Sequence, residues 1–217
     1  MAKKSKKDVQ SLKIPKPILI AAKFLAFISP KLAVLFAARL FTMPIKHKIP
    51  KRELEMDTNS FQKTIAIPSI NKEVVVYHYG SGDRKILLVH GWSGRGTQLV
   101  KFAEALVAQG YATISFDAPA HGKSTGKTTL LPEFIESIVE LEKQFGPFEA
   151  AIGHSLGGMS LLNALSRGLK IDRLAIIGSG DIVSDIFDDF VLQLGLKHAL
   201  SKLLQNHFEK KYHQSYR

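Results

Sequence analysis

A serine between two glycines, in the stretch AAIGHSLGGMSLLNAL, constrains the fold of this chain more than any other feature. The residues before Gly153 form an apolar, strand-like run, and a helical pattern begins directly after Gly157. Glycine is needed at both positions where a strand turns into a helix so sharply that side chains would collide with neighbouring backbone. Such a turn exposes the hydroxyl of Ser155 and places the amide of Leu156 at a helix N-terminus, where it can stabilise an oxyanion. We therefore predict that Ser155 is a nucleophile.

The chain from residue 85 onward alternates strand-like and helix-like segments. Four apolar runs, KILLVHG, YATISFDAP, FEAAIGHS and IDRLAIIGSG, are separated by segments with helical spacing. This order predicts a mostly parallel sheet with helices on both faces, which is an α/β fold. Upstream, KTIAIP and EVVVYHYG flank the turn-like SINK and are typical of an antiparallel pair.

The second motif is LLVHGWSG, in which a predicted buried strand ends at His90-Gly91 and the chain turns sharply. Gly91 permits the close approach of this turn to a neighbouring segment. The amide of Trp92 could then face Ser155 as a second oxyanion donor. A simple strand-to-helix turn also explains Gly91, but it does not explain this position relative to Ser155.

The third motif, FDAPAHGKST, follows the next predicted strand. Together the three motifs resemble the α/β-hydrolase family, in which strand–HG, strand–D-x-x-G-H-G-x-S and strand–G-x-S-x-G occur in this order. The resemblance covers residues 64 to about 180, and Ala120 stands where glycine is usual. It implies an esterase-like or lipase-like serine hydrolase in which Asp117 and His121 stabilise a turn beside the site.

The resemblance also implies an acid and a histidine base later in the chain, in the order Ser, Asp or Glu, His. Asp181 follows the predicted strand after the nucleophile, a position that some family members use for the acid. Three tail histidines, His198, His207 and His213, are candidates for the base, but solvated side chains explain them equally well. We expect the last strands of the fold to be missing and the domain to be incomplete, as in a fragment or a shortened relative.

A basic leader, residues 1–52, precedes the domain predicted for residues 53–217. The leader carries 13 Lys or Arg and one acid, whereas the remainder is close to neutral. Its apolar segments, interrupted by Lys23 and Pro30, predict two short helices. The leader could lie on an anionic membrane surface, pack against its own domain or a partner, or span a bilayer. Residues 181–217 are expected to form a helical tail or a lid.

Several classes of function are excluded or disfavoured by composition. The chain has no cysteine, which rules out disulfides and thiolate catalysis and fits a cytoplasmic protein, peripheral to the inner membrane face if the leader binds lipid. No metal-ligand spacing, phosphate loop or dinucleotide fingerprint occurs, so no cofactor or metal is expected. The near-neutral domain disfavours nucleic-acid binding. The expected partner is a small acyl substrate, and the alternative function is a non-catalytic or truncated hydrolase-like scaffold at a membrane surface.

Overall fold

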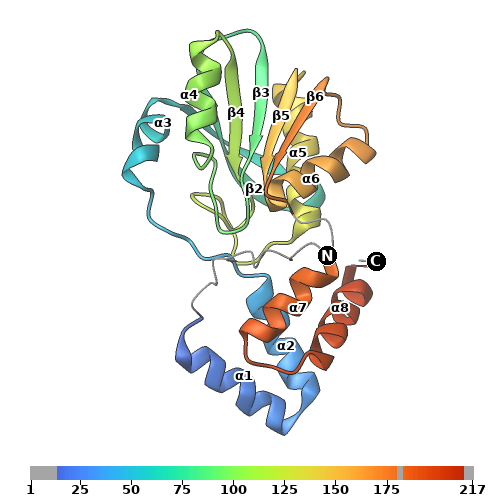
Figure 1. Ribbon diagram of the computed structural model, residues 1–217. Helices are drawn as coiled ribbons and strands as arrows, with labels where there is room; N and C mark the ends of the chain where they lie inside the picture. Colours follow the sequence, from blue (N-terminus) through green and yellow to red (C-terminus); the bar gives the residue numbers. More distant parts are fainter. Residues whose placement is uncertain (1–13, 180–182, 213–217) are drawn as a thin grey trace, which may run out of the picture. The chain divides into compact units, whose positions relative to one another are not determined.

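The computed structural model describes residues 14–179 and 183–212 in two compact units (Figure 1). The larger unit, within residues 42–181, contains the sheet and its flanking helices. The smaller unit combines residues up to Phe41 with residues from 182 onward and is entirely helical where it is described. The predicted boundary after residue 52, and the description of the last segment as a tail or lid, stay predictions about domain organisation.

The larger unit has a six-stranded sheet with the order β1-β2-β4-β3-β5-β6. Its strands are β1 (Phe61–Ile67), β2 (Lys72–Tyr79), β3 (Lys85–Val89), β4 (Ala112–Asp117), β5 (Ala150–His154) and β6 (Arg173–Ile177). The pairs β3–β4, β3–β5 and β5–β6 are parallel, and β1–β2 and β2–β4 are antiparallel. The predicted α/β fold is confirmed, including the antiparallel pair, whose turn is the short helix η2 (Pro68–Ile70).

Helices cover both faces of this sheet (Figure 1). They are η1 (Lys51–Glu53), α3 (Leu54–Asn59), α4 (Val100–Ala108), α5 (Leu131–Phe145) and α6 (Leu156–Ser166). Alternate residues of β3 point to opposite faces. Leu87 and Val89 pack in the main core with residues of α5 and α6, whereas Ile86 and Leu88 pack with residues of α3 and α4. The continuous apolar run of β3 follows from this burial on both sides.

Strand β6 is the last strand of the sheet among the described residues and pairs only with β5. Ile176 is 38% exposed, in contrast to the buried residues of the central strands. Strand β6 therefore forms one edge of the described sheet.

The smaller unit contains four helices, α1 (Lys16–Ile28), α2 (Pro30–Phe41), α7 (Val183–Gln193) and α8 (Ala199–Tyr212). α2 packs against both α1 and α8, and α7 packs against α8. The Phe41 ring lies 4.9 Å from the Phe187 ring and 5.4 Å from the Phe208 ring, between centroids. Leader and tail therefore share one apolar core.

The two leader helices begin near the prolines that predicted them. Pro17 is the second residue of α1, and Pro30 is the first residue of α2. In residues 14–179 and 183–212, no helix has the length and apolar character needed to cross a membrane.

Candidate active site

Ser155 occupies the tight turn between β5 and α6. Its backbone has φ 51° and ψ −119°, a conformation that non-glycine residues rarely adopt because Cβ collides with the backbone. The Ser155 amide donates a hydrogen bond to the carbonyl of Ile177, the last residue of β6, with a distance of 2.9 Å. The turn is thus anchored to the neighbouring strand, and the predicted strand-to-helix junction is present.

The two glycines around Ser155 lie against backbone on both sides. A Cβ at Gly153 would lie 2.6 Å from the amide nitrogen of Gly158, and a Cβ at Gly157 would lie 2.3 Å from the carbonyl oxygen of Val89. Neither backbone atom can move without displacing a strand or a helix. The physical need for glycine at these positions is therefore the one that the sequence predicted.

The loop after β3 approaches the serine closely. A Cβ at Gly91 would lie 3.2 Å from the Cβ of Ser155 and 2.9 Å from Nδ1 of His154. The amide of Gly91 donates to the side chain of Gln98 (3.0 Å), and the amide of Gly94 donates back to the Gly91 carbonyl (3.0 Å). These bonds hold the loop in a tight turn beside Ser155.

Two backbone amides next to this contact have no hydrogen-bond partner in the part of the chain that the structure describes. Among the described residues, neither the amide of Trp92 nor that of Leu156 donates a hydrogen bond to another group. Leu156 is the first residue of α6, so its N–H belongs to the positive end of the helix dipole. Both amides can therefore donate to a ligand.

Two buried histidines tie the loops together. The amide of Ala118 donates to Nε2 of His90, and the amide of Ser93 donates to Nε2 of His121, both at 3.0 Å. Nδ1 of His90 donates to the Gly91 carbonyl at 2.7 Å, and Nδ1 of His121 donates to a carbonyl in its own loop at 3.0 Å. Burial lowers the pKa of His90 to about 4 and that of His121 to about 3. Both rings are neutral, fully hydrogen-bonded and unavailable as bases.

Asp117 holds the third predicted motif in place. Its carboxylate accepts hydrogen bonds from the amides of Gly96 (2.6 Å) and Lys123 (2.7 Å) and from the hydroxyl of Tyr77 (2.9 Å). Burial and the adjacent Asp117 carboxylate raise the pKa of Tyr77, which stays protonated as a donor. Asp117 and His121 thus stabilise turns beside the site, as the resemblance implied.

Ala120 marks the departure from the family pattern. It has φ 65°, in the left-handed region that glycine adopts without strain, and its amide donates to the Thr125 carbonyl at 2.8 Å. The turn therefore keeps the conformation that the usual glycine would favour. The methyl group of Ala120 is buried.

A buried ion pair joins the loop after β3 to η1. Nη1 of Arg95 and the hydroxyl of Thr97 both donate to Oε2 of Glu53 at 2.9 Å, and the Glu53 side chain is 1% exposed. Sequence reasoning missed these residues, because Glu53 and Arg95 are 42 positions apart and belong to no periodic pattern. The only sequence signal for this ion pair is an arginine among the small residues of the turn SGRGT.

The predicted acid and the predicted bases are not among the described residues of the larger unit, which contains Ser155. No side chain among them forms a hydrogen bond with the Ser155 hydroxyl. Asp181 and His213 lie outside the described residues. His198 lies in the smaller unit, where its Nε2 is 3.2 Å from the carboxylate of Asp188, and burial lowers the pKa of His207.

His154, which precedes Ser155, is an unexplained polar group of the site. Its Nδ1 is buried and has no hydrogen-bond partner among the described residues. This nitrogen is enclosed because Gly91 lies so close that a Cβ there would be 2.9 Å from it. The sequence analysis assigned no role to this side chain.

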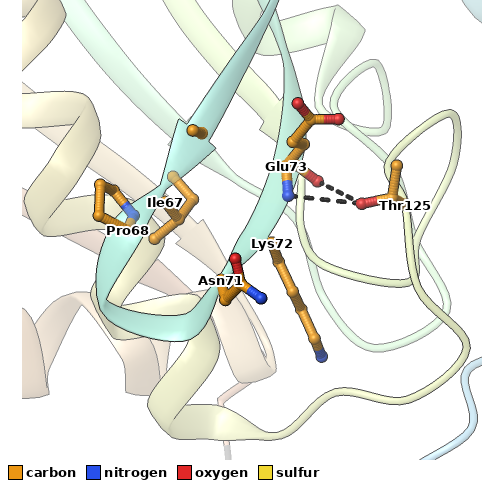
Figure 2. Close-up of a pocket in the computed structure, with 7 residues that line it drawn as sticks. Ile67, Pro68, Asn71, Lys72, Glu73 and Thr125 are labelled. Carbon is orange, nitrogen blue, oxygen red and sulfur yellow. Dashed lines mark hydrogen bonds between the residues drawn. The ribbon is translucent and has the colours of Figure 1, made fainter.

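A separate cavity of about 360 Å³ lies beside the β1–β2 turn (Figure 2). Thr125 closes one side through hydrogen bonds to the backbone of Glu73, and the ammonium of Lys72 donates to the carboxylate of Glu133. None of the residues that line it belongs to the turn of Ser155 or to the loop after β3. Within the ranges that the structure describes, no cluster of His, Asp or Glu could hold a metal ion.

Comparison with known proteins supports the same fold. The model of the Alpha/beta hydrolase family matches residues 86–209. A bromoperoxidase from Bacillus anthracis is 21% identical, with 61% of this chain and 55% of that chain covered and a TM-score of 0.51. The Pyrococcus furiosus esterase Pf2001 is 19% identical in one crystal form, with 80% of this chain and 69% of that chain covered and a TM-score of 0.56.

The coverage of these solved structures is partial. The match to the bromoperoxidase spans 55% of its chain, and the match to another crystal form of the esterase spans 60%. No curated protein matches the sequence significantly.

Proposed function

The chain belongs to the alpha/beta hydrolase family, and on that premise we propose that it is a serine hydrolase acting on carboxylic esters or related acyl compounds. Ser155 is the nucleophile. The amides of Trp92 and Leu156 form the oxyanion hole. No cofactor or metal takes part in this reaction.

The proposed reaction has two steps. The Ser155 oxygen attacks the acyl carbon while its proton passes to a histidine base, and the carbonyl electron pair moves to an oxygen held by the two amides. The oxyanion collapses, the alcohol leaves with the proton, and an acyl-enzyme remains. Water activated by the same base then releases the acid and restores the hydroxyl of Ser155.

One observation carries this proposal: the strained backbone of Ser155, with φ 51° and ψ −119°. Such a conformation costs on the order of 1–3 kcal/mol and persists only where the surrounding structure enforces it. The contacts of Gly153 and Gly157 enforce it here. A serine that served only to begin α6 would have ordinary extended N-cap geometry and would carry no such cost.

The base and the acid belong to the proposal as well. Asp181 stands four positions after the end of β6 in the sequence and is our candidate acid. The base is one of the histidines of the C-terminal segment, His198, His207 or His213.

A non-catalytic scaffold is the second candidate function. The observation that favours it is that the Ser155 hydroxyl forms no hydrogen bond with a described histidine of the larger unit. Such a protein would retain the fold and the turn but would not form a covalent intermediate.

A fluorophosphonate probe distinguishes the two candidates. The serine hydrolase should be labelled, and Ser155→Ala should abolish the label. Ser166→Ala, which removes an exposed hydroxyl from the same helix, is the matched control and should be labelled normally. Absence of labelling in well-folded protein would favour the scaffold, whereas equal labelling of Ser155→Ala would show that Ser155 is not the nucleophile.

A further inference from the structure

Helix α1 has an apolar outer face that its own unit leaves uncovered. Ile20, Phe24, Phe27 and Ile28 are 68%, 61%, 90% and 55% exposed. At 100° per residue these four side chains fall within an arc of about 100°. The opposite side contains the fully buried Ala22, and α1 packs against α2. The helix is thus apolar on both faces, and only one of them is buried.

Positive charge borders this outer face. Lys16 and Lys23 are exposed and lie together at one edge of the apolar arc, about 20° apart around the helix. The sequence of residues 1–13 adds five lysines and one aspartate, and Lys31 is exposed at the start of α2. An apolar surface with cations along its edge is the pattern of a helix that lies in a membrane interface.

We propose that the outer face of α1 docks on an anionic lipid bilayer. The four apolar side chains enter the boundary between headgroups and acyl chains, while Lys16 and Lys23 contact lipid phosphates. The 13 residues of α1 span about 20 Å, less than the roughly 30 Å of a bilayer core, so the helix lies parallel to the membrane.

Charge favours a bilayer over a second copy of this chain as the occupant. Two copies meeting through α1 would bring Lys16 and Lys23 of both copies together, along with two leaders of strongly positive charge. An anionic surface is instead attracted by the same groups, by about fivefold in affinity per lysine near the surface. This inference does not depend on the chemistry of Ser155.

Vesicle sedimentation with the full chain tests the proposal. The protein should partition at least about tenfold more strongly onto vesicles containing phosphatidylserine than onto phosphatidylcholine alone. Phe24→Ser/Phe27→Ser should weaken that partitioning about tenfold or more, because two aromatic side chains no longer enter the bilayer. Lys16→Gln/Lys23→Gln should weaken binding to phosphatidylserine vesicles about 25-fold and leave binding to neutral vesicles unchanged.

The matched control removes apolar side chains elsewhere on the same unit. Leu192 and Leu203, on α7 and α8, are 52% and 46% exposed, and Leu192→Ser/Leu203→Ser should partition like the unmodified chain. Circular dichroism verifies that each variant is folded, and fluorophosphonate labelling of Phe24→Ser/Phe27→Ser should persist if Ser155 is reactive. The proposal would be overturned if Phe24→Ser/Phe27→Ser partitioned like the unmodified chain, or if the unmodified chain bound both vesicle types equally. It would also be overturned if the unmodified chain bound no vesicles but formed a dimer that Phe24→Ser/Phe27→Ser abolished.

Discussion

The α-carbon of Gly157 packs so tightly against the end of β3 that a Cβ there would lie 2.3 Å from the carbonyl oxygen of Val89. Gly157→Ala should therefore destabilise the protein by about 3 kcal/mol, because α6 must move away from the sheet. Urea denaturation followed by circular dichroism measures this loss.

The neighbouring Gly158 provides the control. A Cβ at this position would lie 2.6 Å from Cγ2 of Ile176, a side-chain methyl group of a residue that is 38% exposed, rather than from backbone. Gly158→Ala should change stability by less than about 1 kcal/mol, since alanine also favours the helix by roughly that amount. Equal destabilisation by the two substitutions would show that the backbone contact with β3 is not the constraint.

A second prediction concerns the approach of Gly91 to Ser155. In Gly91→Ala, the added methyl group must push the loop away from His154 and Ser155, and the Trp92 amide moves with it. Loss of one oxyanion donor costs about 100-fold to 1000-fold in kcat, so we expect slower ester hydrolysis at a nearly unchanged KM. Hydrolysis of a p-nitrophenyl ester measures both quantities.

A change in overall stability must be separated from this effect. Gly110→Ala places a methyl group in open space but in a left-handed conformation, with φ 85°. It should destabilise the chain by about 1 kcal/mol and leave the rate of ester hydrolysis unchanged. An unaltered kcat in Gly91→Ala would remove Trp92 from the oxyanion hole.

The third prediction follows from the pKa values of His90 and His121, about 4 and about 3. In the unfolded chain both groups titrate near 6.5, so the unfolded state binds more protons below that pH. Their contribution to stability is complete above about pH 6.5 and is lost as the pH falls toward 4 and 3. Together they should lower the free energy of unfolding by about 2 kcal/mol between pH 6 and pH 5.

Urea denaturation at several pH values tests this slope. His121→Gln should reduce it by about half, whatever its effect on stability at pH 7.5, because only His90 still takes up a proton on unfolding. His78 and His207, whose pKa values burial also lowers, add smaller contributions of the same sign. A stability that does not change between pH 6 and pH 5 would contradict the neutral, buried state of both rings.

The succession of strands along the chain and the turn at Ser155 could be predicted because their signals are local. Each of β3, β4 and β5 is a continuous apolar run ending in a diagnostic motif, and the glycines around Ser155 stand within two residues of it. The identity of the oxyanion donors stays a prediction. So does the role of Asp181, which lies outside the described residues.

The polar contacts beneath the site could not be predicted from the sequence. Tyr77 meets Asp117 across 40 positions, and Glu53 meets Arg95 across 42, only because β2 pairs with β4 and η1 lies near the loop after β3. A single buried hydrogen-bonded pair produces no periodic pattern in the sequence from which it could be predicted. The tail was likewise predicted only as helical, and the sequence analysis did not place the break at Gly195, with φ 69°, between α7 and α8.

The fourth prediction concerns Asp117 as an acceptor of three hydrogen bonds. In Asp117→Asn, the amide group must replace one carboxylate oxygen, and either orientation sets it against a backbone N–H, of Gly96 or of Lys123. The buried donor loses its partner, and we expect a loss of about 2–4 kcal/mol in the free energy of unfolding.

Tyr77→Phe removes the third donor but leaves both amides paired, so it should cost only about 1–2 kcal/mol. Chemical denaturation ranks the two variants, and a larger loss in Tyr77→Phe would show that the hydroxyl, rather than the two loop amides, determines the stability of this turn.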